Sequence, residues 1–431
     1  MICDVAVIGG GPAGLAAALA SGGAGAKTLL IEREGRLGGI LKQCIHDGFG
    51  VIRFGQKLSG PEYSQRDIDE LGKSSVERRL LTFVSRVHRE EEGFTLTLSS
   101  GEGMDRVRAK TLVLATGCRE RTARQVSIHG TRPAGVITAG AAQYYTNILG
   151  RLPCRRCVIL GSGDIGLIMA RRLTLEGAEV IGVYEAKSTP SGLSRNIVQC
   201  LGDFNIPLHV GKTVTRVFGR KRLEAVEIAS VDEAMKVLPG TEERISCDGL
   251  VLSVGLIPEN ELAETLGVIL DGAARGPLCD QTYMTSVPGI FCCGNALLVN
   301  DLADYVSETG RAAGQNAALA ALGKGAFGGP AVSGSPVAGD CLAALRADSN
   351  FLCLVPQRLN TEALEKETAV FFRTKRERGK SLVRAESEGR ELFSRTYNQL
   401  RPPEMERVII DFSSAGLKKG SEVQFTLEEK I

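Results

Sequence analysis

The chain has 431 residues, which is enough for two or three domains with a substantial core. Hydrophobic residues make up 43% and charged residues 24% of it, the composition of an ordinary globular protein. The formal net charge of +2 is too small to indicate a general affinity for nucleic acid or for membranes, so nucleic acid is excluded as an expected partner.

The 12 cysteines are scattered through a long chain, which favours thiols in a reducing compartment over a disulfide framework. The apolar segment 15–20 resembles the core of a secretory signal, but no basic segment precedes it, and glycines and a proline at 9–12 interrupt the run. No stretch approaches the ~20 uninterrupted apolar residues of a membrane span. These features predict a cytoplasmic protein without a membrane span.

The chain opens with a β-branched run at 5–8, which passes through a glycine turn into an Ala- and Leu-rich helical pattern. The turn has the spacing Gly9-x-Gly11-x-x-Gly14, typical of a strand, tight turn and helix that bind a dinucleotide. In this motif Gly9 allows the turn, Gly11 lets the backbone approach a pyrophosphate, and Gly14 lets helix and strand pack closely. Glu32 ends the next apolar run, where a ribose-binding carboxylate is expected.

A glycine-punctuated loop with one thiol and one imidazole follows at 36–50, and a polar segment compatible with a helix lies at 62–79. Three strand-like runs come next, at 81–88, 94–98 and 107–114. The last run ends in Ala115-Thr116-Gly117.

The opening pattern returns at residue 157. A short apolar run leads into Gly161-x-Gly163-x-x-Gly166 and a helical pattern, the next strand ends in Glu185, and a later one ends in Gly255. The first glycine and the acidic residue lie 23 positions apart in the first copy and 24 in the second. The repeat indicates an internal duplication of a nucleotide-binding unit, a much stronger signal than one glycine fingerprint.

Past the second copy, 285–295 has the pattern of a turn, a buried strand and a Gly294-Asn295 loop, and a helical pattern follows at 305–322. The Gly-, Ala-, Ser- and Pro-rich segment 323–339 predicts a linker. Beyond it, alternating runs predict antiparallel strands at 370–374, 381–385, 392–397, 408–412 and 422–427. The basic cluster Arg373, Lys375, Arg376, Arg378 and Lys380 either docks an acidic partner or, more commonly for such runs, forms a solvated hairpin tip.

Together these motifs resemble the flavoprotein superfamily with two dinucleotide-binding domains, which includes glutathione and thioredoxin reductases. The resemblance covers about residues 1–325. It implies an α/β fold with two Rossmann-like domains, the FAD domain being split by an inserted NAD(P) domain, plus a small β-rich C-terminal domain. The expected boundaries are 1–122 and 257–325 for the FAD domain, 150–256 for the NAD(P) domain, 323–339 for the linker and 340–431 for the C-terminal domain.

The resemblance also implies two cofactor sites, FAD and NAD(P)H. No metal site is expected, because the single C-x-x-C pair supplies only half of a four-ligand zinc site. The FAD site would consist of Gly9, Gly11, Pro12, Ala13, Gly14, Glu32, Arg33, Gly38, Gly39, Ile40, Ala115, Thr116, Gly117, Gly294 and Asn295. The NAD(P) site would consist of Gly161, Gly163, Asp164, Ile165, Gly166, Glu185 and Gly255.

Two of these positions carry a specific expectation. The superfamily usually has Asp where this chain has Asn295, and that Asp bonds the ribityl chain of the flavin; an Asn carbonyl can accept the same bond without the charge. Glu185 favours NADH, because a carboxylate pairs with the ribose hydroxyls and repels a 2′-phosphate. Lys187 and Arg195 soften that preference.

Segments 39–50, 131–136 and 190–196 and the β-rich tail are similar to a narrower group, the flavoproteins found with the flavin-dependent glycerol-3-phosphate dehydrogenase of anaerobic bacteria. A more distant resemblance is to the nucleotide-binding subunits of multi-subunit amino-acid, opine and cyanide-forming dehydrogenases. These proteins do not share one substrate. What they imply is a redox partner protein or subunit, in a homo- or hetero-oligomer.

The candidate catalytic residues are Cys44, His46 and Lys42. Cys44 and His46 share one face if their segment is extended, and the resemblance places the loop beside the flavin. The imidazole then either moves a proton as the flavin changes charge or is an ordinary hydrogen-bonded loop residue. Lys42 binds an anionic acceptor, stabilises reduced flavin, or is a solvated loop lysine; these three alternatives stay open.

The other cysteines are interpreted as structural. Cys154 and Cys157 have C-x-x-C spacing with flanking arginines, but they directly precede a buried strand, which favours packing over a redox or metal role. Cys292 and Cys293 are expected in the core.

Three functions stay open from the sequence. The first is an FAD-dependent, NAD(P)-linked oxidoreductase that exchanges electrons with a partner. The second is an NAD(P)H-dependent disulfide reductase that uses either Cys44, the one cysteine of the flavin loop, or the pair Cys154 and Cys157. The third is a non-catalytic flavin-binding docking subunit.

Overall fold

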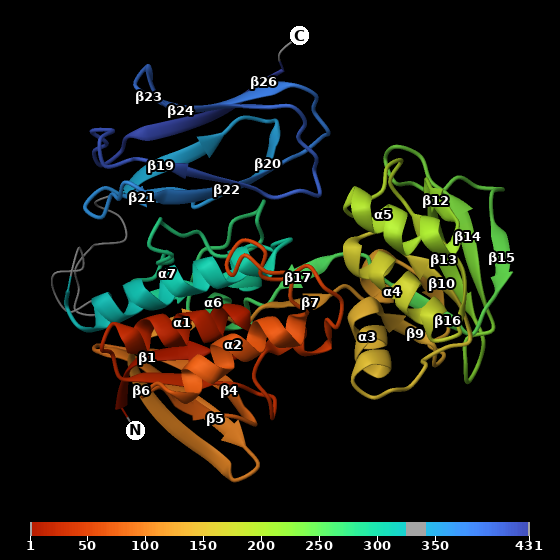
Figure 1. The fold of residues 1–431 in the computed structure, drawn as a ribbon, viewed down its shortest axis with the longest axis horizontal. Coiled ribbons are helices and arrows are strands. Elements are labelled where there is room, and N and C mark those ends of the chain that lie inside the picture. The colour runs from red at the N-terminus through yellow and green to blue at the C-terminus, as the bar shows by residue number, and fades with distance from the viewer. Residues whose placement is uncertain (1, 325–341, 430–431) are drawn as a thin grey trace. The chain divides into compact units, whose positions relative to one another are not determined.

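The computed structural model describes residues 2–324 and 342–429 (Figure 1). Most of the predicted linker, from 325 to 339, lies outside the described residues. The chain divides into two compact units, one comprising residues 1–118 and 258–431 and the other residues 119–257. It crosses between them through β7 (Cys118–Glu120) and β17 (Leu256–Pro258), which pair as a two-stranded sheet.

The first unit is built on a seven-stranded sheet with the order β3-β2-β1-β6-β5-β4, on which β18 pairs with β6. β1 pairs in parallel with β2 and β6, which is the arrangement of a Rossmann-like fold. Its strands are β1 (Ile2–Ile8), β2 (Thr28–Ile31), β3 (Glu77–Arg79), β4 (Thr82–Glu90), β5 (Gly93–Ser100), β6 (Gly103–Leu114) and β18 (Ile290–Cys292).

Helices α1 (Pro12–Gly23) and α7 (Ala303–Ala321) run side by side against this sheet (Figure 1). Their close approach depends on two glycines of α7: a Cβ on Gly310 would lie 2.2 Å from the carbonyl oxygen of Ala13, and one on Gly314 would lie 2.1 Å from that of Ala17. The helical segments of this unit also include η1 (Gly39–Gln43), α2 (Gly60–Gly72), α6 (Glu261–Thr265) and η4 (Gly294–Ala296).

The C-terminal part of the first unit consists of two sheets, with the orders β21-β19-β26-β23-β24 and β20-β22-β25. Side chains along β23 alternate between buried and half-buried, as expected for strands that cover a core on one face. The strands are β19 (Leu342–Ala347), β20 (Phe351–Val355), β21 (Arg358–Asn360), β22 (Thr368–Thr374), β23 (Ser381–Ser387), β24 (Arg390–Tyr397), β25 (Glu406–Ile410) and β26 (Glu422–Glu429).

Two arginines fasten this β-rich part to the rest of its unit. Arg407 donates to the carboxylate of Glu308 on α7 at 2.8 and 3.0 Å. Arg373, from the predicted basic cluster, forms an ion pair with Asp301 and is largely buried. The interpretation of that cluster as a solvated hairpin tip or a docking patch is therefore wrong for Arg373, because its guanidinium is paired with Asp301 of the same chain.

The second unit has a parallel five-stranded sheet with the order β12-β11-β10-β16-β9 and a four-stranded sheet with the order β15-β14-β13-β8. Its helical segments are η2 (Ala123–Val126), α3 (Ala139–Asn147), α4 (Asp164–Leu175), α5 (Ser194–Cys200) and η3 (Gly202–Phe204). Its strands are β8 (His129–Gly130), β9 (Val136–Thr138), β10 (Arg156–Leu160), β11 (Glu179–Glu185), β12 (Leu208–Val210), β13 (Lys212–Phe218), β14 (Ala225–Ser230), β15 (Glu243–Ser246) and β16 (Gly249–Leu252).

The mixed sheet of the first unit, the parallel sheet of the second and the β-rich C-terminal part confirm the predicted fold class. β9 and α3 precede residue 150, the expected start of the NAD(P) domain, and β9 pairs with β16 in the same sheet. The expected domain boundaries stay a prediction. No helix among the described residues is long and apolar enough to cross a membrane.

Candidate nucleotide sites

The first glycine turn joins β1 to α1, and two of its glycines are demanded by the protein itself. Gly9 has a φ of +107°, and a Cβ there would lie 2.3 Å from the carbonyl oxygen of Ala115. A Cβ on Gly14 would lie 1.7 Å from the carbonyl oxygen of Gly9. Both glycines thus let the helix pack against the strand ends.

Gly11 differs from Gly9 and Gly14, because neither its backbone conformation nor a close contact within the protein requires glycine at this position. Its φ of −76° and ψ of −174° suit other residues, and the nearest atom to a Cβ would be the Cα of Gly39, 3.8 Å away. Gly11 is the N-cap of α1 and no side chain caps this helix. The open space in front of free N–H groups fits the pyrophosphate of a dinucleotide.

Glu32 lies at the carboxyl end of β2, buried beside this turn with 7% of its surface exposed. One carboxylate oxygen accepts from the backbone N–H of Gly10 at 2.6 Å and the other from that of Glu34 at 2.8 Å. These bonds fix the carboxylate next to the glycine turn, where the expected ribose contact requires it. Arg33, which follows it, is exposed.

The later FAD motifs converge on the same turn. The backbone N–H of Ala115 donates to Ile8 at 2.9 Å, and that of Gly38 donates to Gly10 at 2.8 Å. A Cβ on Gly294 would lie 2.7 Å from the Cβ of Ala13.

Asn295 is held by two contacts of its own. Its Oδ1 accepts from the backbone N–H of Asn300 at 3.0 Å, and its Nδ2 faces the Sγ of Cys118 at 3.5 Å. The ribityl contact expected of its carbonyl stays a prediction, and in the structure this oxygen already has one donor.

The second glycine turn, between β10 and α4, repeats the first. Gly161 has a φ of +98° and a Cβ there would lie 2.0 Å from the carbonyl oxygen of Ser253, while one on Gly166 would lie 2.6 Å from that of Gly161. A Cβ on Gly163 would lie 3.5 Å from the Oγ of Ser253 and 4.0 Å from its carbonyl oxygen, both ordinary contacts. The middle glycine is again the one that the protein does not demand.

Glu185 occupies the position of Glu32 in the second copy and is 6% exposed. Its carboxylate accepts from the backbone N–H of Ser162 at 3.1 Å, from the Oγ of Ser162 at 2.6 Å and from the backbone N–H of Lys187 at 3.0 Å. Sequence reasoning missed Ser162 as a positioning residue, although the Gly-Ser-Gly motif contains it.

The other expected NAD(P) residues have different surroundings. The Oδ1 of Asp164 accepts from the backbone N–H of Leu193 at 2.8 Å and from the Nδ2 of Asn196 at 2.7 Å, so this carboxylate holds the segment that starts α5. Ile165 packs partly buried against the core of its unit. Gly255 has a φ of +103° and its Cβ position lies 3.8 Å from the side chain of Arg121.

A comparison with protein families decides the class of this chain. The model of the pyridine nucleotide-disulphide oxidoreductase family matches residues 3–318. The chain belongs to this family. Membership confirms, at the level of the family, the predicted class of FAD-dependent, NAD(P)-linked oxidoreductases and the predicted cofactors FAD and NAD(P)H.

Curated relatives include the HcnB component of hydrogen cyanide synthase of Pseudomonas protegens, 28% identical over 62% of this chain and 60% of that protein. One of the opine oxidase subunits of Agrobacterium tumefaciens is 25% identical over 74% of this chain and 65% of that protein. This chain therefore spans less than two thirds of either relative. Thioredoxin reductase of T. acidophilum has a similar fold, with a TM-score of 0.60 and 22% identity over 74% of this chain and 98% of that one.

Within this family member, the candidate catalytic loop differs from the expected extended segment. Cys44 follows the short 3₁₀ helix η1, is 8% exposed, and donates from its Sγ to the carbonyl oxygen of Ile40 at 3.4 Å. Lys42 forms an ion pair with Glu34 and donates to the carbonyl oxygen of Arg36 at 2.8 Å. The ring of His46 lies 3.0 Å from the carbonyl oxygen of Asp47. The catalytic roles of all three stay predictions.

The 11 described cysteines form no disulfide. Cys154 and Cys157 hydrogen-bond each other and are 3% and 0% exposed; their bond lowers the pKa of Cys154, and the same bond together with burial raises that of Cys157. Cys292 and Cys293 are fully buried, as predicted. Among residues 2–324 and 342–429, no three His, Cys, Asp or Glu side chains are grouped to hold a metal ion.

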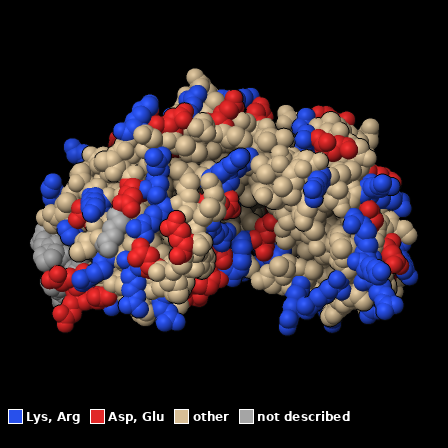
Figure 2. Space-filling model, turned by 90° about the horizontal axis from the view of Figure 1, so that it is seen from below, with Lys and Arg blue, Asp and Glu red and all other residues tan. Residues whose placement is uncertain are grey.

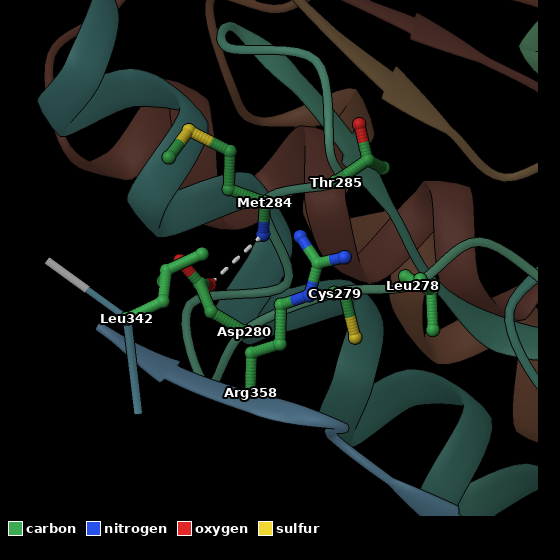
Figure 3. A pocket seen from close by; sticks show the side chains of 7 residues that line it. All are labelled: Leu278, Cys279, Asp280, Met284, Thr285, Leu342 and Arg358. Carbon is green, nitrogen blue, oxygen red and sulfur yellow. Dashed lines mark hydrogen bonds between the residues drawn. The ribbon is translucent and has the colours of Figure 1, made fainter. Parts of the chain in front are cut away.

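A small pocket lies inside the first unit, where residues 278–285 meet Leu342 and Arg358 of the β-rich part (Figure 3). Asp280 is the buried acid of this pocket. Its Oδ1 accepts from the N–H and Oγ1 of Thr282 at 2.8 and 2.6 Å and from the N–H of Met284 at 3.3 Å. Burial nevertheless raises the pKa of Asp280 from 3.8 to about 6.

Asp280 makes the free energy of unfolding depend on pH. Between about pH 4 and pH 6 the unfolded chain loses the proton that the folded chain keeps, so this group's contribution to stability falls as the pH rises, by on the order of 3 kcal/mol. The Asp280→Asn variant lacks this loss. In chemical unfolding, we expect the free energy of unfolding of the variant minus that of the parent to be larger at pH 7 than at pH 4. The exposed Glu92→Gln variant is the control; equal pH profiles for Asp280→Asn and the parent would contradict the assignment.

Proposed function

We propose that the chain is a flavin-dependent oxidoreductase subunit, located in the cytoplasm, that transfers hydride between a nicotinamide nucleotide and flavin and exchanges electrons with a partner redox protein. The observation that carries this proposal is the repeated turn: each copy has a buried, backbone-bonded glutamate and one glycine that no close contact within the protein requires. When bound, the flavin supplies the hydride and electron transfer.

The chain's own residues bind and orient the two nucleotides. The N–H groups around Gly11 and Gly163, at the amino ends of α1 and α4, would bind the pyrophosphates, and Glu32 would bind the ribose of FAD. Glu185 favours NADH over NADPH, since its carboxylate is fixed by Ser162 and would repel a 2′-phosphate.

The partner is proposed from two sources. Curated relatives are named as subunits of hydrogen cyanide synthase and opine oxidase, which supports a multi-subunit enzyme. The narrower resemblance in the sequence supports a system that oxidises glycerol 3-phosphate, with the alcohol oxidised by the partner.

Anaerobic mixing of the purified protein with NADH or NADPH tests the proposal. We expect the visible flavin band to bleach faster with NADH, because Glu185 tolerates a ribose hydroxyl better than a phosphate. A protein that stays colourless after incubation with FAD would refute it, and a flavin that neither nucleotide reduces would leave only a docking role.

Disulfide reduction is a second candidate, favoured by the contact between Cys154 and Cys157. Cys154 precedes β10 and Cys157 is the second residue of that strand, whereas the glycine turn follows its last residue, so the thiols and the nucleotide turn lie at opposite ends of β10. Thiol titration of the same NADH-treated sample separates the candidates: a gain of two thiols is required for a disulfide reductase.

A further inference from the structure

The end of α3 exposes a group of large apolar side chains. Between 40% and 46% of the surface of each is exposed, in a part of the chain where the backbone folds back on itself. The N–H groups of Ile148 and Leu149 donate to the carbonyl oxygen of Tyr144, and that of Arg151 donates to Tyr145 at 2.9 Å. We call this group the α3 patch: Tyr144, Tyr145, Ile148, Leu149 and Leu152.

Cations border the α3 patch on the side of the loop that follows it. The guanidinium of Arg222 donates to the carbonyl oxygen of Pro153 at 2.7 Å, which places the turn 219–222 against this loop. The N–H of Ala134 donates to the carbonyl oxygen of Lys221 at 3.0 Å, which brings the segment with Arg132 to the same turn. We call these side chains the basic rim: Arg132, Arg151, Arg155, Arg156, Arg220, Lys221 and Arg222.

Few acidic groups neutralise the basic rim. Asp248 accepts from the backbone of Arg155 and Arg156 and lies 3.4 Å from Arg222, and Glu179 pairs with Arg156 at 3.0 Å. Within the described residues, the other rim side chains have no acidic partner. Residues 119–257 contain 18 Lys and Arg against 13 Asp and Glu, although the whole chain is nearly neutral. Figure 2 shows cations gathered over this unit, on the right.

The α3 patch lies at the end of the parallel sheet opposite the second glycine turn. β10 begins at Arg156 and runs to that turn, so the loop 150–155 is at its amino end. α3 follows β9, a strand parallel to β16 and β10, and its last turn leads into the same loop. A protein bound here would leave the amino end of α4 accessible to a nucleotide.

We propose that the α3 patch and the basic rim bind a partner subunit of the same enzyme, through a surface that is apolar at its centre and acidic around it. The proposal rests on the proposed function, whose partner protein is the occupant. Two of the five patch residues are Tyr and six of the seven rim residues are Arg, and both residue types are enriched in protein interfaces. A second copy of this chain is a poor occupant, because a two-fold contact would oppose the two basic rims.

Purification of the tagged chain from its native source, with hydrogen exchange of the complex and of the chain alone, tests this surface. We expect the amides of 144–152 to be protected in the complex. Leu149→Ser and the double variant Arg151→Glu, Arg155→Glu should weaken the complex by about tenfold or more, by loss of apolar contact and by charge reversal. Their flavin spectrum and reduction by NADH should match the parent.

The matched controls are Val198→Ser and Lys236→Glu, exposed positions of the same unit that lie outside patch and rim. Three results would overturn the proposal: a complex in which 144–152 stays unprotected, no complex at all, or an isolated chain that instead sediments with phosphatidylglycerol vesicles through this patch. Failure of the proposed function has a different signature, because it shows as a colourless protein or a flavin that nicotinamide nucleotides do not reduce.

Discussion

Gly11→Ala is expected to give a protein that folds like the parent but binds FAD on the order of 100-fold more weakly. The methyl group meets no protein atom closer than 3.8 Å, and the backbone angles at this position suit alanine. It would stand where the pyrophosphate approaches the N–H groups of α1. Losing one or two hydrogen bonds to a charged group, worth about 1.5–3 kcal/mol each, accounts for the effect.

Two substitutions in the same helix sharpen this experiment. Gly23→Ala places its methyl group where no atom lies within 4 Å, so it should keep FAD and be as stable as the parent or slightly more stable. Gly14→Ala drives a methyl group into the carbonyl of Gly9 and should fold poorly. The ratio of visible to ultraviolet absorbance and the unfolding midpoint without FAD are measured for all three. If Gly11→Ala were destabilised as much as Gly14→Ala, Gly11 would be required for folding, which would contradict its proposed role in binding FAD.

The fold was predictable because its signals are local. A β-branched strand, three spaced glycines and an Ala-rich helix are contiguous in sequence, and the second copy at Gly161 supplies an internal check. Close backbone approaches at Gly9 and Gly14 follow from that spacing alone. The same reasoning located Glu32 and Glu185 at the strand ends.

The features that could not be predicted from the sequence depend on tertiary contacts and on burial. The pairing of Arg373 with Asp301 joins positions 72 apart, and no local pattern separates such an arginine from its exposed neighbours. The shared face of Cys44 and His46 depended on an extended backbone, whereas Cys44 directly follows the 3₁₀ helix η1 with φ −85° and ψ 74°. The raised pKa of Asp280 arises from burial, which its polar neighbours in sequence do not signal.

Gly163→Ala is expected to separate the two nucleotide sites. The methyl group would lie 3.5 Å from the Oγ of Ser253, an ordinary contact, at φ −65° and ψ 159°, where alanine is unstrained. The variant should therefore keep its flavin while its affinity for NADH falls on the order of 100-fold, because the pyrophosphate is pushed away from the amino end of α4. The apparent dissociation constant comes from the NADH dependence of anaerobic flavin bleaching.

Gly202→Ala is the matched control in the same unit, since no atom lies within 4 Å of its Cβ position. It should bleach like the parent. If Gly163→Ala also did, the second turn would not hold the nicotinamide nucleotide. If it lost flavin instead, the two turns would not be separate sites. We expect Gly11→Ala to lose the visible flavin spectrum, and Gly163→Ala to keep that spectrum but lose reduction by NADH. These opposite outcomes are required if the first turn binds FAD and the second binds the nicotinamide nucleotide.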